Sequence, residues 1–233
     1  MKKYYLFFFF LLTLIGCNKS GSVDSTQAGL KDSASLIAGK GDVDKGAYIF
    51  KEEKDRADTL VKYVELAMSS KDKSNYDRLI FNSFPDSFDG MFKLFGFDKE
   101  MGGAPLYKWP DGENVIKYFG GIQSIPKAEY YGKYINICIN GYWDADNIKT
   151  AFGFHKRLSE DTKSVCQVLS KRTDDEVMSV FRFIFDSPHP KNEENAMIYK
   201  DLQAKLKLED THMADLLKTA YEKVLSTDDG HGK

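Results

Sequence analysis

The two side chains best suited to acid–base chemistry are Asp186 and His189, which stand three residues apart beside Pro188 and Pro190. An imidazole exchanges protons near neutral pH, and a nearby carboxylate can orient it or act as the second acid or base. Further acids at 193–194 would allow a metal site instead. The Asp-x-x-His spacing is also common by chance, and His189 could simply cap the neighbouring helix. Hydrolysis through Asp186 and His189 is therefore an alternative, and the sequence predicts no catalytic residue and no metal ligand.

Other catalytic and cofactor motifs are absent from the sequence. It contains no Gly-x-Ser-x-Gly elbow, no Gly-x-Gly-x-x-Gly turn, no phosphate-binding P-loop and no His-Glu-x-x-His pair. Asp144 and Asp146 could be the paired carboxylates of a glycosidase, but two residues apart at a helix start they are better suited to capping. We therefore expect no cofactor and a protein that is not an enzyme.

A cluster suited to binding lies in the stretch Ile-Asn-Gly-Tyr-Trp-Asp-Ala-Asp at 139–146. Tyr142 and Trp143 stand at a junction between two expected helices and are followed by Asp144 and Asp146. Tyrosine and tryptophan are over-represented among the residues that dominate binding energy at interfaces. The competing interpretation is that Trp143 fills the gap between two helices. The sequence predicts Tyr142, Trp143, Asp144 and Asp146 as a partner-binding surface.

The N-terminus indicates where the protein is held. Lys2 and Lys3 precede an apolar run from Tyr4 to Ile15, which is shorter than the roughly 20 residues a membrane-spanning helix needs and has the layout of a secretory signal. Its end, Leu14-Ile15-Gly16-Cys17, resembles the lipobox of bacterial lipoproteins. That resemblance implies a signal peptide at 1–16 and acyl chains such as palmitate on Cys17, which anchor the chain in a membrane of the cell envelope. By the same resemblance, Asn18 after the cysteine favours the outer membrane.

Composition narrows the range of partners. Loss of the signal would remove Lys2 and Lys3 from the 33 basic and 35 acidic residues of the chain, which leaves a net charge of −4. A mildly acidic chain gives no reason to expect nucleic acid as a partner, because nucleic-acid binding relies on basic contacts to phosphates. The expected partners are the membrane, through Cys17, and another protein.

The segment after the lipobox has the composition of a tether. Residues 18–46 contain five glycines, five serines and no aromatic residue. We interpret 17–46 as the lipidated cysteine with a flexible linker, whose typical end-to-end distance would be about 30 Å. A folded domain at its end could stand away from the membrane.

Residues 47–226 are predicted to form one all-α domain of about eight or nine short helices, and 227–233 a frayed tail. Apolar residues recur at helical spacing through most of this region, and alternating strand patterns are nearly absent. Thr173-x-x-Glu176 is a capping box. Stacking of helix hairpins is a further expectation. The segments with helical patterns, from which these helices are expected, are 52–69, 74–84, 85–98, 112–122, 126–143, 144–158, 159–172, 173–187, 195–207 and 210–226, with a long loop at 99–113.

Two cysteines remain if Cys17 is lipidated. Cys138 and Cys166 both lie among apolar residues at helical spacing. An exported protein can oxidise such a pair, but a free cysteine is itself among the most commonly buried residues. The sequence alone does not decide whether Cys138 and Cys166 form a disulfide or remain free thiols.

These features together suggest a non-enzymatic binding protein on a lipid anchor. In type, a small helical lipoprotein with a Gly/Ser tether resembles immunity proteins that neutralise toxins in the bacterial envelope. The resemblance implies capture of another protein. An envelope hydrolase using Asp186 and His189 and a structural or assembly lipoprotein are the alternatives.

Overall fold

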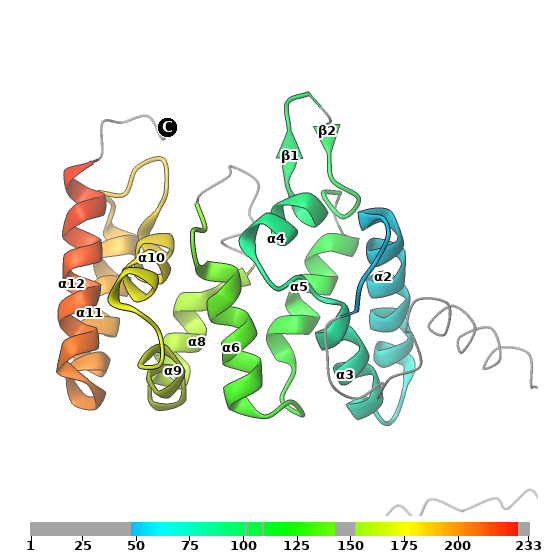
Figure 1. The fold of residues 1–233 in the computed structure, drawn as a ribbon, viewed down its shortest axis with the longest axis horizontal. Helices are drawn as coiled ribbons and strands as arrows, with labels where there is room; N and C mark the ends of the chain where they lie inside the picture. The colour runs from blue at the N-terminus through cyan, green and yellow to red at the C-terminus, as the bar shows by residue number, and fades with distance from the viewer. Residues whose placement is uncertain (1–47, 101, 109, 143–151, 228–233) are drawn as a thin grey trace, which may run out of the picture. The chain divides into compact units, whose positions relative to one another are not determined.

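The computed structural model describes residues 48–100, 102–108, 110–142 and 152–227. These residues form ten helices and one pair of two-residue strands, which confirms the predicted all-α class (Figure 1). The chain divides into two units, residues 1–40 and 41–233, and the described residues all belong to the second. Among the described residues, no helix has the length and apolar character needed to cross a membrane.

The first half of the domain contains four helices and the strand pair. The strands are antiparallel, with Phe97 opposite Gly103 and Asp98 opposite Gly102. Its first strand lies at the end of the segment predicted as a helix at 85–98, because α4 ends at Phe95, and its second strand lies in the predicted loop at 99–113. Gly102 of the second strand has a φ of 83°, which is strained for other residues. The elements are α2 (Glu53–Ser69), α3 (Ser74–Ser83), α4 (Phe88–Phe95), β1 (Phe97–Asp98), β2 (Gly102–Gly103) and α5 (Asp111–Gly121).

The second half contains six helices. The first is α6, and the five that follow Phe152 pack against one another, with α12 lying along both α10 and α11 (Figure 1). The elements are α6 (Lys127–Cys138), α8 (Phe154–Glu160), α9 (Thr162–Leu169), α10 (Asp174–Phe185), α11 (Glu193–Glu209) and α12 (Thr211–Ser226).

Local capping explains where several helices begin. The hydroxyl of Thr173 accepts a hydrogen bond from the amide of Glu176, whose carboxylate in turn accepts one from the amide of Thr173, so the predicted capping box is confirmed. Asn192 and Asp210 cap α11 and α12 in the same way through side-chain oxygens. Each cap satisfies amide groups that have no partner inside the helix.

The helix predicted at 126–143 is shorter than expected. It begins after Pro126 and ends at Cys138, because Asn140 has a φ of 58° and no α-helix continues through that conformation. Tyr142 therefore lies beyond the end of this helix, where it is 44% exposed. Residues 144–151 of the segment predicted at 144–158 lie outside the described residues, and its remainder contributes to α8, which begins at Phe154. The segment predicted at 159–172 differs, since α8 continues to Glu160 and α9 begins at Thr162.

The central helix α6 joins the two halves. It packs against α4 on one side and against α9 and α10 on the other. Seven of its twelve residues are buried, including three tyrosines and Lys133. A helix that is buried on most sides must satisfy its polar groups internally, and Lys133 does so by donating to the carbonyl oxygens of Phe81 at 2.6 Å and Phe84 at 2.9 Å.

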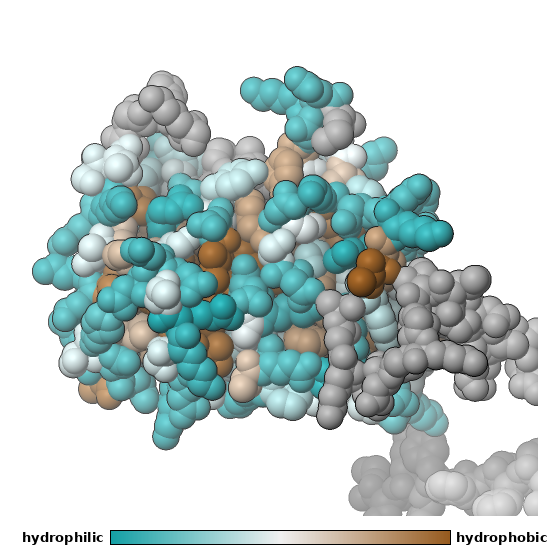
Figure 2. All heavy atoms as spheres, viewed as in Figure 1, coloured by the Kyte–Doolittle hydropathy of each residue, from teal (hydrophilic) through white to brown (hydrophobic). Residues whose placement is uncertain are grey.

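The surface is mainly hydrophilic in the view of Figure 2, with small separate hydrophobic areas. The described part of the chain has six exposed large hydrophobic residues: Ile49, Met68, Phe97, Tyr142, Met197 and Leu208. Single exposed apolar residues are normal on protein surfaces. Only exposed apolar residues that share a face or a site point to binding.

Candidate functional site

Only one of the predicted partner-binding residues lies in the described part of the chain. Tyr142 is described, whereas Trp143, Asp144 and Asp146 fall within 143–151, outside the described residues, as does the lipobox cysteine Cys17. The geometry of the candidate site is therefore that of Tyr142 and of the residues that hold it.

Two aromatic residues of α4 support the Tyr142 ring. The ring centroid lies 4.7 Å from that of Phe88 and 6.1 Å from that of Phe92. Phe88 is buried and also meets Phe183 of α10 edge-on at 5.4 Å. The ring of Tyr142 thus rests on the core while 44% of the residue stays exposed, an arrangement that limits the entropy lost when a partner covers it.

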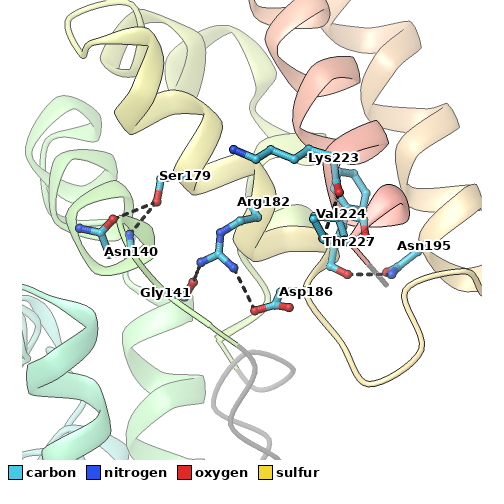
Figure 3. A network of polar contacts seen from close by, with 10 residues as sticks. Asn140, Gly141, Ser179, Arg182, Asp186, Asn195, Lys223, Val224 and Thr227 are labelled. Atoms are coloured by element: carbon cyan, nitrogen blue, oxygen red, sulfur yellow. Dashed lines mark hydrogen bonds and ion pairs between the residues drawn. The ribbon is translucent and has the colours of Figure 1, made fainter. Parts of the chain in front are cut away.

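The backbone that carries Tyr142 is fixed by polar contacts to α10 (Figure 3). The amide of Asn140 donates to the Ser179 hydroxyl at 2.8 Å, and the guanidinium of Arg182 donates to the carbonyl oxygen of Gly141. A side chain at Gly141 would place its Cβ 2.8 Å from the ring of Phe183. Only glycine therefore allows this close approach of the two segments.

The first described residue after 143–151 is Phe152, and it packs against the central helix α6. Phe152 stacks on Tyr134 of α6 with centroids 4.1 Å apart, and its carbonyl oxygen accepts a hydrogen bond from the Tyr134 hydroxyl at 2.7 Å. Gly153 follows with a φ of 58°, which suits glycine. Both flanks of 143–151 are consequently attached to α6, one directly beyond its end and one through Tyr134.

The residues proposed for acid–base chemistry have other contacts. The carboxylate of Asp186 pairs with the guanidinium of Arg182 at 3.2 Å, one helical turn away (Figure 3). His189 is exposed, and its carbonyl oxygen accepts a hydrogen bond from the Asn192 side chain at 2.6 Å. Asn195 ties the same turn together by donating to the carbonyl oxygens of Phe185 and Pro190. Among the described residues, no group of three or more His, Cys, Asp or Glu side chains could hold a metal ion.

The two cysteines whose oxidation state the sequence did not decide are free thiols in the structure. Cys138 and Cys166 are both buried. Burial raises the pKa of the Cys138 thiol well above its ordinary value and that of Cys166 to about 11. Because the thiolate is the reactive form, neither thiol is poised to act as a nucleophile or a metal ligand.

A groove between α8 and α11 is a second feature of the surface. It has a volume of about 310 Å³, and its lining includes the apolar side chains of Met197, Ile198 and Leu202. At its edge the Ser159 hydroxyl donates to the Asp201 carboxylate at 2.6 Å, and the ammonium group of Lys205 contacts both. These hydrogen bonds from Ser159 and Lys205 lower the pKa of Asp201, which makes its carboxylate a weaker proton acceptor for the serine hydroxyl.

Only some of the contacts at the edge of this groove could be predicted from the sequence. The four-residue spacing of Asp201 and Lys205 on a helix indicates an ion pair on its surface. Ser159 lies 42 residues before Asp201 and 46 residues before Lys205, so no local sequence pattern predicts its contacts with them.

No family model, no curated protein and no solved structure matches this chain.

Proposed function

We propose that this chain is a lipid-anchored protein of the bacterial envelope that binds another protein without catalysis, as an immunity protein does when it neutralises a toxin. The anchor is proposed from the lipobox Leu14-Ile15-Gly16-Cys17 and the Gly/Ser-rich residues after it. Protein binding is proposed from the surface around Tyr142.

The observation that carries the binding proposal is the exposed ring of Tyr142 on a fixed base. Its ring is supported by two phenylalanines, its backbone is held from α10, and its sequence neighbours are Trp143 and two aspartates. Residues that dominate interface energy are aromatic side chains whose conformation is already set before binding. The buried thiols and the ion-paired Asp186 also give the described residues little reactive chemistry.

Photocrosslinking in the producing cells tests the binding site. A benzoylphenylalanine at position 142 is expected to crosslink to one protein, which mass spectrometry then identifies. The matched control is position 199, because Tyr199 is also a partly exposed tyrosine in contact with another ring, that of Tyr221 at 4.4 Å. A crosslink pattern that is the same from both positions, or none from 142, would contradict the assignment of the site.

The anchor is tested separately. We expect the mature protein to carry a lipid mass on Cys17 and to sediment with membranes, whereas Cys17→Ala is expected to lose both properties. If the Cys17→Ala chain carries no lipid mass but still sediments with membranes, the proposed anchor is contradicted. That outcome would not affect the crosslinking test of the Tyr142 site.

A further inference from the structure

The short helix α4 links the exposed ring of Tyr142 to a second exposed ring, that of Phe97. These two are the aromatic residues among the exposed large hydrophobic residues of the described chain, and they are 44% and 43% exposed. Tyr142 contacts Phe88 and Phe92 on α4, and Phe97 follows two residues after that helix ends at Phe95. Both exposed rings therefore belong to the surface around one helix.

Close packing continues the aromatic contacts from α4 onto the hairpin. The half-buried ring of Phe92 lies against Gly96, where an added Cβ would be 2.5 Å from it, and Gly96 directly precedes Phe97. On the hairpin, the centroid of the Phe97 ring lies 5.3 Å from that of Tyr107. We call these four residues the aromatic row: Tyr142, Phe92, Phe97 and Tyr107.

The hairpin that carries Phe97 is fixed to the end of α4. The amide of Ala104 donates to the carbonyl oxygen of Gly96 at 2.9 Å, and the amide of Leu106 donates to that of Leu94 at 2.8 Å. These bonds attach the chain that leaves the hairpin to the helix that leads into it. The position of the Phe97 ring is therefore set before binding, which limits the entropy lost when a partner covers it.

The surroundings of Tyr142 indicate in which direction a binding surface extends. Towards α10 its neighbours are the polar side chains of Ser179, Arg182 and Asp186 (Figure 3). Because an aromatic residue offers about 150–250 Å² in total, Tyr142 at 44% exposure supplies roughly 100 Å². A standard interface buries about 800 Å² on each partner. A standard interface on Tyr142 therefore covers neighbouring surface too, and the exposed aromatic part of that surface continues towards the hairpin.

The tip of the hairpin is charged. Asp98, Lys99 and Glu100 follow Phe97, and the tip projects beyond the helices and is hydrophilic in the space-filling view (Figures 1 and 2). The Asp98 carboxylate accepts a hydrogen bond from the amide of Glu100 at 2.8 Å. Transfer of these charges into hydrocarbon would be costly, so the hairpin is poorly suited to enter a bilayer. An apolar centre beside a charged edge is instead the usual anatomy of a protein interface.

We propose that the protein partner of Tyr142 also covers Phe97, so that the aromatic row forms the centre of one interface and the charged hairpin tip forms part of its rim. The partner then presents an apolar surface to the two rings and a polar one to the tip. Both rings are aromatic anchors held in place by the domain, and residues of this kind dominate interface energy. This inference rests on the proposed function, because Phe97 is assigned to the partner through its continuity with Tyr142.

Photocrosslinking from position 97 tests whether the two rings share a partner. Benzoylphenylalanine at position 97 is expected to crosslink to the same protein as benzoylphenylalanine at position 142. The matched control is position 68 on α2, because Met68 is also an exposed apolar residue, at 66%, and lies outside the aromatic row.

The outcomes separate this inference from the proposed function. If position 142 crosslinks to a partner while position 97 crosslinks to nothing, to lipid or to a second copy of this chain, the shared interface is overturned and the proposed function stands. An equal yield of the same protein from position 68 also overturns the shared interface. The absence of any crosslinked protein from position 142 overturns both.

Calorimetric titration with the crosslinked protein distinguishes the centre of the interface from its rim. Phe97→Ala is expected to weaken binding about tenfold or more, and Phe97→Tyr should retain most of the affinity because the ring remains. Lys99→Ala at the tip should change the affinity less than about threefold, since rim charges contribute little to it. The melting temperature of each variant checks that it is folded. Full affinity in Phe97→Ala, or an equal loss in Lys99→Ala, would contradict the assignment of Phe97 to the centre.

Discussion

Among single residues, the tyrosines of α6 show how this core accommodates polar groups. Tyr130 donates its hydroxyl proton to the carbonyl oxygen of Phe119 at 3.0 Å, and Tyr134 donates to that of Phe152. Burial raises the pKa of Tyr130 to about 12 and keeps that of Tyr134 well above its ordinary value. The hydroxyl groups are satisfied only in their protonated form, so the core depends on their remaining neutral.

This dependence predicts alkaline instability. Below the ordinary tyrosine pKa of about 10, both folded and unfolded chains are protonated and the contribution of these residues is fully present. As the pH rises from 10 towards 12, the unfolded chain loses protons that the folded chain keeps, so the free energy of unfolding falls. Denaturant unfolding across this range, with tyrosinate absorbance as the second readout, measures the effect. Ionisation of all tyrosines together near pH 10 in the folded protein would contradict it.

Lys133 gives a second prediction. Its ammonium group is buried, donates to the carbonyl oxygens of Phe81 in α3 and Phe84 directly after it, and pairs with the Asp86 carboxylate at 2.8 Å. We expect Lys133→Met to lower the free energy of unfolding by about 2–4 kcal/mol, because the carbonyl groups would lose their donor. Lys93→Met, which breaks an exposed pair with Asp89, should have little effect. Similar losses from both variants would show that the buried position of Lys133 is unimportant.

For the helices, capping residues set the starts and close contacts set the ends. The capping box before α10 was readable from the sequence because all its parts lie within four residues. Thr173→Ala is expected to cost about 1 kcal/mol in thermal or denaturant unfolding. The control is Thr219→Ala in α12, whose hydroxyl bonds only to the carbonyl oxygen of Asp215 one turn earlier. A control that loses as much stability as the cap variant would rule out the capping explanation.

The end of α6 was not readable in the same way. The pattern of apolar residues continues past Cys138, and only the backbone of Asn140 and the approach of Phe183 to Gly141 end the helix. Both depend on packing between segments some 40 residues apart. The exposure of Tyr142 follows from this early end, so the sequence identified the residue as a binding candidate without showing how it would be held.

Gly141 provides the corresponding prediction. Gly141→Ala should lower the free energy of unfolding by about 1–3 kcal/mol, since its Cβ would overlap the Phe183 ring. Gly132→Ala, inside α6 where an added Cβ meets no atom within 4 Å, should instead stabilise the protein by about 0.5–1 kcal/mol. Calorimetry of the two variants compares the same substitution at two environments. Equal effects of the same sign would contradict the proposed close contact.

Over the whole molecule, helical periodicity predicted the fold class and most helices because the core is built from amphipathic faces. It missed the short β1–β2 hairpin, and it could not predict the contacts of Ser159 with Asp201 and Lys205 at the edge of the groove, because those partners are distant in sequence. Trp143, Asp144, Asp146 and Cys17 lie outside the described residues, so their roles stay predictions. We propose that these parts form a helical domain that is tethered to a membrane and offers Tyr142 to a protein partner.

The affinity of the protein crosslinked from position 142 tests this account most directly. Isothermal titration calorimetry should show that Tyr142→Ala weakens binding about tenfold or more while the melting temperature is unchanged, and that Tyr142→Phe retains most of the affinity because the ring remains. Tyr199→Ala, the matched control on α11, should bind as the unchanged protein does. Full affinity in Tyr142→Ala, or equal loss in Tyr199→Ala, would contradict the assignment of Tyr142 as the contact residue.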